Sequence, residues 1–252
     1  MELNHRLYGL FQDKAAQVNV EILNLGLSYT CVTTSDGGMG VAFTWLDNGK
    51  MCCQALDGMR YEGRPADELL QTILDPHPLK RSMGLALINA LNHAQALELP
   101  EDTDNGQLFD LLGVGPGSRV AMVGYFGPMM KAFEDRGAVL EVIDYNKNIG
   151  NPQEFYAKLG SWAEVLFLTS TSILNQSTEE ILDRAPNAVR TVMLGPSTPM
   201  ASNAFAHLPV DLLAGTVPVD QDKVLQAVRN GAGTRMIQKF SRKVHAELGP
   251  DR

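Results

Sequence analysis

Short apolar segments alternate with helix-forming segments through the second half of this 252-residue chain. The apolar segments lie at 119–125, 139–144, 164–170, 189–195 and 211–217. Helices are predicted between and after them at 128–136, 152–160, 176–185, 199–206 and 221–230. Strands that are apolar on both faces need a cover on both faces, and helices supply it. The pattern therefore predicts an α/β unit with a parallel sheet.

The first hundred residues have a different pattern. They contain a polar helix-forming stretch, three strand-like runs and two further helix-forming stretches, at 3–17, 19–34, 40–46, 50–56, 63–74 and 78–97. The strand-like runs are separated by Asp36-Gly37-Gly38 and Asp47-Asn48-Gly49-Lys50, and such glycine turns suit hairpins. The sequence thus predicts a small antiparallel sheet followed by helices, an α+β arrangement.

Two further segments complete the prediction. Residues 98–107 are acidic and contain both proline and glycine, which is typical of a linker. We therefore divide the chain into domains at 1–100 and 101–252. Residues 234–248 are basic and are predicted to form a solvated surface helix.

Composition excludes several classes of function. The net charge of −8 argues against a general binder of nucleic acids or anionic membranes, which would need a basic face. No apolar run approaches the ~18 residues of a membrane span, and the N-terminal segment lacks the features of a secretory signal. Three cysteines, two of them adjacent, make a poor disulfide framework. We expect a cytoplasmic, reduced protein.

Glycine and hydroxyl residues follow nearly every predicted strand of the second half. In chain order, these strand ends are Gly124-Tyr125-Phe126-Gly127-Pro128, Asp144-Tyr145-Asn146, Thr169-Ser170-Thr171-Ser172, Gly195-Pro196-Ser197-Thr198-Pro199 and Gly215-Thr216. Ligands of open parallel sheets bind where the carboxyl ends of the strands meet the helix starts. The convergence of small polar residues on this edge predicts a cleft for a polar small molecule.

Each of these residues also has a purely structural interpretation. Gly124 and Gly127 can simply make a tight turn from strand to helix. Asp144 stands twenty residues after Gly124, where dinucleotide-binding folds place a ribose-binding acid, but an acid at that point can also cap a turn. Ser170, Thr171 and Ser197 can serve as helix caps. The full G-x-G-x-x-G phosphate loop is missing after the first strand, because Tyr125, Phe126 and Pro128 interrupt it.

A metal centre built by the protein is not predicted. Cys52 and Cys53 are adjacent in a predicted strand, so their side chains should point to opposite faces. The sequence contains no C-x-x-C and no pair of histidines at helical spacing. His93 is interpreted as a packed or surface histidine.

Several strand-end motifs resemble those of a known family. They are "LTSTSILNQST" (168–178), "VMLGPSTPM" (192–200), "LLAGTVPVD" (212–220) and the Gly124–Pro128 turn. Together they are similar to the family described as "putative heavy-metal chelation", and "LGLSYTCV" and "GVAFT" resemble its amino-terminal strands. The resemblance implies a small enolase-N-terminal-like α+β domain followed by a Rossmann-like domain. Ser170-Thr171-Ser172 departs from the family pattern, which has a glycine there.

The resemblance also implies a ligand cleft between the two domains. The candidate residues that it suggests are Tyr29, Thr30, Gly124, Tyr125, Phe126, Asp144, Ser170, Thr171, Asn175, Gly195, Pro196, Ser197 and Thr198. Aromatic rings in the first loop suit stacking on a flat heterocycle better than cradling a pyrophosphate.

We interpret the chain as a small-molecule-binding protein. The favoured hypothesis is an enzyme acting on a planar metal-chelating compound, such as a pterin-, flavin- or siderophore-like molecule. The alternatives are a non-catalytic carrier of a metal–ligand complex and an enzyme resembling S-adenosylmethionine-dependent methyltransferases, which rests on Asp144 and fold analogy. No cofactor is assigned, and a homo-oligomer is left open.

Overall fold

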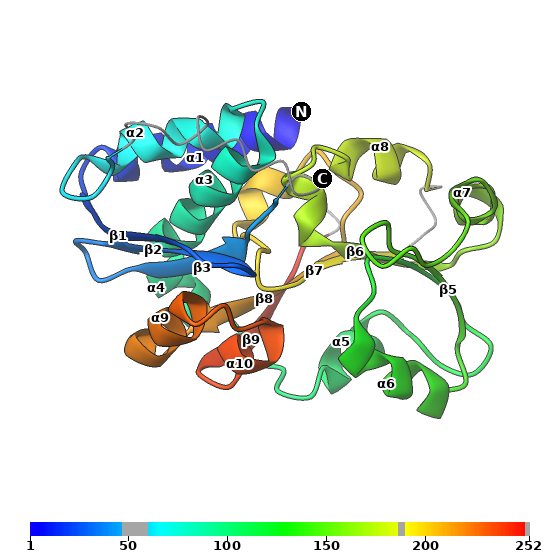
Figure 1. Cartoon of the computed structure of the whole chain (residues 1–252). Helices are drawn as coiled ribbons and strands as arrows, with labels where there is room; N and C mark the ends of the chain where they lie inside the picture. The colour runs from blue at the N-terminus through cyan, green and yellow to red at the C-terminus, as the bar shows by residue number, and fades with distance from the viewer. Residues whose placement is uncertain (47–59, 186–189, 250–252) are drawn as a thin grey trace.

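The computed structural model describes residues 1–46, 60–185 and 190–249. It contains two sheets that lie side by side (Figure 1). The first is antiparallel and has the order β1-β2-β3, from Val20–Leu25, Tyr29–Thr34 and Met39–Phe43. Both predicted classes of architecture are therefore present: a small α+β part and a larger part with a mainly parallel sheet.

Helices cover both faces of the small sheet. One face packs on α3 (Pro78–Leu91), which is flanked by α1 (Glu2–Ala15), α2 (Ala66–Leu70), the 3-10 helix η2 (Gln71–Leu74) and α4 (His93–Leu97). The other face packs on α9 (Gln221–Arg229), from the far end of the chain, as Figure 1 shows. Every residue of β2 is buried in consequence, which explains why "YTCVTT" lacks charged residues.

The structure corrects one prediction in this part of the chain. The run 19–34 forms two strands, β1 and β2, which pair antiparallel, instead of one long strand. The chain reverses at Gly26, where a Cβ atom would lie 2.4 Å from the carbonyl oxygen of Val228 and 2.8 Å from that of Tyr29. Only glycine fits there. The turn at Asp36–Gly38 joins β2 to β3 as predicted, whereas Asp47–Lys50 and the run 50–56 lie outside the described residues.

The second sheet has six strands in the order β5-β4-β6-β7-β8-β9. They are β4 (Arg119–Val123), β5 (Val139–Ile143), β6 (Val165–Thr169), β7 (Arg190–Leu194), β8 (Leu212–Pro218) and β9 (Ser241–Glu247). The helices α5 (Gly106–Leu111) and α6 (Met130–Asp135) cover one face, while α7 (Pro152–Ser161) and α8 (Thr178–Asp183) cover the other (Figure 1). The 3-10 helices η3 (Gly127–Met129), η4 (Ser170–Ile173) and η5 (Ser202–Phe205) follow β4, β6 and β7.

The predicted basic helix at 234–248 is wrong. Only Thr234–Gln238 is helical (α10), and Ser241–Glu247 forms the edge strand β9, antiparallel to β8. The edge of β8 offers unpaired backbone groups, and the ladder with β9 satisfies them along its whole length. Val244 and Ala246 then enter the core, while Arg242 reaches out to Glu101 at 3.1 Å.

The predicted linker runs along β9. The backbone N–H of Asp102 donates to the carbonyl of Lys243 at 3.0 Å, and that of His245 donates to the carbonyl of Pro100 at 3.1 Å. Asp102 is buried and caps the start of α5 by accepting from the N–H of Leu108 at 2.8 Å. The division into two domains near residue 100 stays a prediction. The predicted linker around that residue is hydrogen-bonded to β9 of the second sheet.

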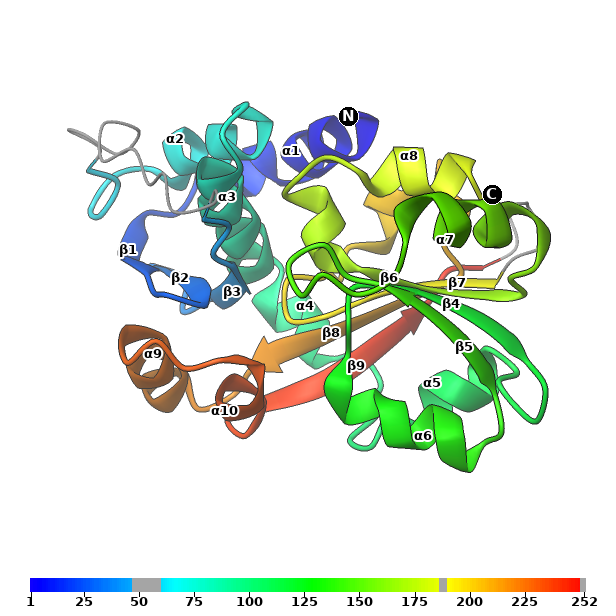
Figure 2. The same cartoon turned by 45° about the vertical axis from the view of Figure 1, so that its right-hand side comes forward.

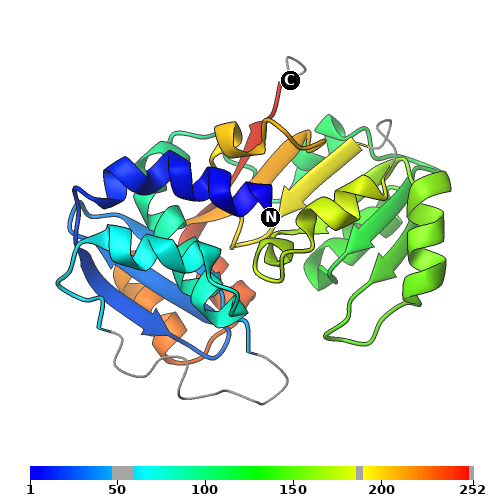
Figure 3. The same ribbon diagram turned by 90° about the horizontal axis from the view of Figure 1, so that it is seen from above.

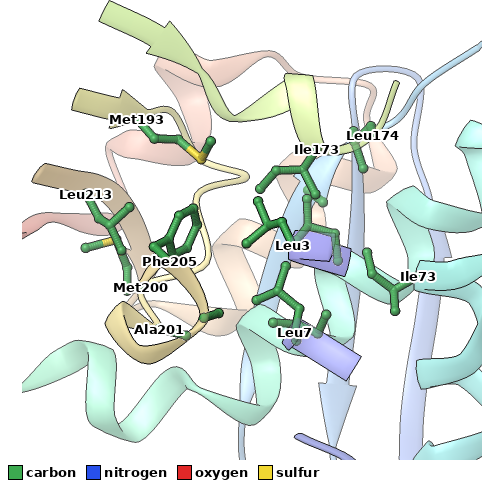
Figure 4. Close-up of a cluster of buried hydrophobic side chains, with 14 of the residues drawn as sticks. Leu3, Leu7, Ile73, Ile173, Leu174, Met193, Met200, Ala201, Phe205 and Leu213 are labelled. Atoms are coloured by element: carbon green, nitrogen blue, oxygen red, sulfur yellow. The ribbon is translucent and has the colours of Figure 1, made fainter. Parts of the chain in front are cut away.

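One apolar core continues from the small part into the large one. Leu3 and Leu7 of α1 pack in the same cluster as Phe205 of η5 and Leu213 of β8 (Figure 4). Figure 3 shows that the first turns of α1 lie over this junction, where the N–H of Leu3 donates to Oε1 of Glu179 at 3.0 Å. The two sheets are thus held in a fixed relation by buried side chains, and the cleft described next lies between them. Within the described residues, no helix is both long and apolar enough to cross a membrane.

Candidate functional site

A cleft of about 1340 Å³ lies at the carboxyl ends of the parallel strands. Its floor is made by the residues that follow β4, β5, β6 and β7. One wall comes from Tyr29 and Phe43 of the small sheet and from Trp45, which follows β3. Figure 2 shows the loops after β6 and β7 lying between the two sheets. The strand order changes direction between β4 and β6, which is the point where open α/β sheets bind ligands.

Most residues proposed from the sequence are brought together here. The cleft is lined by Tyr29, Gly124, Tyr125, Phe126, Asp144, Ser170, Thr171, Asn175, Gly195, Pro196 and Ser197. Thr30 and Thr198 are not among its lining residues. Thr30 follows Tyr29 on β2 and so points to the opposite face, where its hydroxyl lies 3.0 Å from that of Thr44. Thr198 is buried on the side of Asn92 and Met200.

The loop after β4 is held by a carboxylate of the neighbouring strand end. Gly124 has a φ of +88°, and a Cβ atom there would lie 2.8 Å from the Cβ of Thr169. Oδ2 of Asp144 accepts the N–H of Tyr125 at 2.8 Å, and Oδ1 accepts the N–H of Lys147 at 3.0 Å. Both carboxylate oxygens of Asp144 therefore accept backbone N–H groups of neighbouring turns. This is the turn-capping role that the sequence allows for Asp144 besides ribose binding.

Lys147 covers one face of the Tyr125 ring. Its Nζ lies 4.4 Å from the ring centroid, a cation–π contact, and donates to the carbonyl of Tyr125 at 3.3 Å. Phe126 also lines the cleft and packs in part against the apolar cluster under α5 and α6. The rings of Tyr125 and Phe126 thus both lie in the cleft, and Lys147 covers one face of the Tyr125 ring.

The hydroxyls after β6 and β7 differ in their partners. Oγ1 of Thr169 lies 3.0 Å from that of Thr171, and Oδ1 of Asn175 accepts from the hydroxyl of Ser177 at 2.7 Å. Oγ of Ser197 accepts the N–H of Phe43 at 2.8 Å and so ties the loop after β7 to the small sheet. Ser170 is 1% exposed, and no described group hydrogen-bonds to its Oγ.

Residues that the sequence did not suggest complete the walls. Tyr156 of α7 and Arg184 at the end of α8 stack with 4.5 Å between the guanidinium carbon and the ring centroid. Burial raises the pKa of Tyr156, and its hydrogen bond with Tyr145 raises it further. Lys243 and His245 come from β9, in the segment for which the sequence predicts a helix. The alternation of "SRKVHAE" was the one available signal for that strand.

The donor groups do not form a metal cage. In the described ranges, no three His, Cys, Asp or Glu side chains are grouped so that they could hold a metal ion. Cys52 and Cys53, whose directions we predicted, lie outside those ranges. Cys31 is buried in β2 and packs with apolar neighbours.

Two buried side chains, Tyr29 and Cys31, should make the free energy of unfolding fall at alkaline pH. Burial raises the pKa of Tyr29 from 10.0 to about 12 and that of the Cys31 thiol from 9.0 to about 12. The folded chain holds these protons more tightly than the unfolded chain does. Their contribution to the free energy of unfolding is therefore complete below pH 9 and is lost as the pH rises toward 12. Urea unfolding between pH 8 and 11 should show this fall. The Cys31→Ala variant should show a shallower fall, and equal slopes for variant and wild type would contradict the assignment.

Comparison with known proteins gives consistent matches over nearly the whole chain. Two family models match, at residues 107–247 and 8–92, and both are described as "putative heavy-metal chelation". An uncharacterized protein of Methanocaldococcus jannaschii is 21% identical over 259 residues, covering 98% of this chain and 97% of its own.

Two crystal structures of proteins of unknown function have a similar fold. The protein from Pyrococcus horikoshii gives a TM-score of 0.77 at 21% identity and covers 98% of this chain and 100% of its own. The protein from Desulfitobacterium hafniense gives 0.76 at 18% identity, with 95% and 97% covered. At these identities the likeness concerns the fold.

Proposed function

Because the chain belongs to the family described as "putative heavy-metal chelation", we propose that its cleft binds a flat, polar, metal-chelating small molecule. The observation that carries this proposal is the lining of the cleft. Aromatic rings line the cleft on both sides, from Phe43 and Trp45 in the first half of the chain and from Tyr125, Phe126 and Tyr156 in the second. Hydroxyl and backbone groups line it as well. Rings bind the faces of a planar molecule, and the polar groups bind its rim.

The charges in the cleft support a molecule of low net charge. Glu180 is paired with Arg184 at 2.8 Å, and both oxygens of Asp144 accept backbone N–H groups. Lys147 and Lys243 each donate to a backbone carbonyl, of Tyr125 and of Thr103. Positive and negative groups are thus mixed and largely engaged. A pyrophosphate or another strongly anionic group would instead favour a concentration of positive charge.

The donor set also favours a chelate over a bare ion. A transition-metal site built by protein alone needs about four ligands at fixed geometry. The described residues offer no such group in the cleft. A small chelating molecule would supply the ligands itself, and the cleft would recognise the organic part.

Calorimetric titration of the purified protein with riboflavin, biopterin and S-adenosylmethionine tests the proposal. At least one of the first two should bind. Phe126→Ala and Tyr125→Ala should each weaken that binding roughly tenfold or more, since one stack on an aromatic ring contributes about 1–3 kcal/mol. Tyr8→Ala removes a ring from α1, outside the cleft, and is the matched control.

Three results would argue against this mode of binding. Equal affinity of wild type and both cleft variants would exclude stacking in the loop after β4. Binding of S-adenosylmethionine alone, abolished in Asp144→Ala, would favour the methyltransferase hypothesis instead. Failure of riboflavin and biopterin to bind the wild-type protein would remove these two compounds as models of the ligand.

A further inference from the structure

His245 has an unusual position for a buried histidine. It lies on β9 opposite Ala214 of β8, is 5% exposed and lines the cleft. Its Nδ1 is buried, and no group in the described part of the chain forms a hydrogen bond with it. His93 provides a comparison: it is also buried, at 9% exposure, but its Nε2 lies 2.8 Å from the carbonyl oxygen of Pro218.

Ser170 repeats this situation further along the cleft, after β6. Its Oγ has no partner among the described residues, although the side chain is almost fully buried. Gly195 lies directly against it, since a Cβ atom there would come within 2.9 Å of this Oγ. Ser172, two residues later and equally buried, is paired with the hydroxyl of Thr178 at 2.8 Å.

Buried polar atoms without partners are costly and therefore uncommon. The large majority of buried side-chain polar atoms in folded proteins are hydrogen-bonded, and each exception weakens the fold unless a bound molecule supplies the partner. Several side chains in residues 1–46, 60–185 and 190–249 carry such atoms, but of these only Ser170 and His245 line the cleft.

We propose that His245 is a ligand-contact residue, whose imidazole hydrogen-bonds to the polar rim of the bound molecule at the β9 end of the cleft. Ser170 makes the corresponding contact where β6 ends. This inference rests on the proposed binding function. It adds a contact residue to the site and an estimate of the length of the ligand. An imidazole can donate or accept, so it suits the ring nitrogens and carbonyls of a heterocycle.

The separation of the two groups sets the length of the ligand. Strand β6 is followed across the sheet by β7, β8 and β9, so three strand spacings separate Ser170 from His245. At about 4.8 Å per spacing this is roughly 14 Å. A single bicyclic ring is too short to contact both. The site therefore fits an elongated molecule, either a tricyclic ring system or a ring with a polar chain, and riboflavin has both features.

Matched pairs of variants test this inference by stability alone. Ser172→Ala and His93→Leu remove hydrogen-bonded groups, so each should lower the thermal midpoint by roughly 2–4 °C. Ser170→Ala and His245→Leu remove unpaired groups, so their midpoints should equal or exceed that of the wild type. A loss in either of these two variants as large as in its matched control would overturn the inference and make that residue structural.

Binding supplies the second measurement. If riboflavin binds the wild type, His245→Leu and Ser170→Ala should each weaken its binding at least about tenfold. His93→Leu, which replaces a buried histidine outside the cleft, should leave the affinity unchanged. Unchanged affinity in His245→Leu would overturn the role of His245 and leave the proposed function standing. If riboflavin does not bind the wild type, that model of the ligand fails. A loss of stability in His245→Leu or Ser170→Ala as large as in its matched control would still overturn the inference.

Discussion

Replacing Phe205 by alanine is expected to lower the free energy of unfolding by about 3–5 kcal/mol. Phe205 is the last residue of η5, and its ring is fully buried. The ring lies between Leu3 of α1 and Leu213 of β8 (Figure 4). Its removal leaves a cavity at the junction of the two sheets that rigid neighbours fill only in part. Because side chains from both halves of the chain line this cavity, both halves should lose stability together.

The two tryptophans allow each half to be followed separately. Trp45 lies after β3 and Trp162 after α7, and the chain has no other tryptophan. Urea unfolding of Trp45→Phe and Trp162→Phe proteins, each with and without Phe205→Ala, should show the same shift of midpoint with both fluorescent reporters. A shift confined to one reporter would mean that the halves unfold independently and that the shared core does not couple them.

Gly40→Ala should destabilise the protein by about 3 kcal/mol, at the upper end of the range for overpacking. Gly40 lies on β3 where α3 crosses it, and a Cβ atom would come within 2.2 Å of both the carbonyl oxygen of Ala86 and the nitrogen of Ala90. Both are backbone atoms, so no side-chain rotation can relieve the overlap. The helix would have to move away from the sheet along its whole contact.

Gly9→Ala is the matched control, since it adds the same methyl group elsewhere. Gly9 is exposed within α1 and has no atom within 4 Å of the added Cβ, so alanine should stabilise the helix by about 0.5–1 kcal/mol. Denaturant unfolding should therefore give opposite signs for the two variants. A small effect of Gly40→Ala would show that α3 and β3 are less tightly packed than described.

The architecture of the second half followed from its sequence because the central parallel strands β4, β6 and β7 and strand β8 are mainly apolar on both faces. The runs that became β4 to β8 have no other compact arrangement than a sheet covered by helices. The run 19–34 was misjudged because Gly26 alone marks the turn, with no asparagine or aspartate beside it. Residues 241–247 were misjudged because lysine and arginine favour helices locally, while the open edge of β8 decides the outcome.

The floor of the cleft was predictable for the same topological reason. Carboxyl ends of parallel strands meet at one edge, so Gly124, Asp144, Ser170 and Gly195 had to lie near one another. His245 reaches the cleft from an antiparallel strand. Tyr156 and Arg184 reach it from helices whose rotation is set by packing. No local sequence pattern predicts that these residues reach the cleft. The sequence also does not show that Ser172 has a hydrogen-bond partner and Ser170 has none among the described residues.

Native mass spectrometry of freshly purified protein tests the central claim most directly, because it asks what the cleft holds without choosing a probe. We predict an organic adduct, with or without a metal in it, that is retained in Tyr8→Ala and lost or strongly reduced in the Tyr125→Ala, Phe126→Ala double variant. A stoichiometric metal ion bound without any organic compound, and unaffected by the double variant, would contradict the claim that the protein recognises a flat chelating molecule in this cleft.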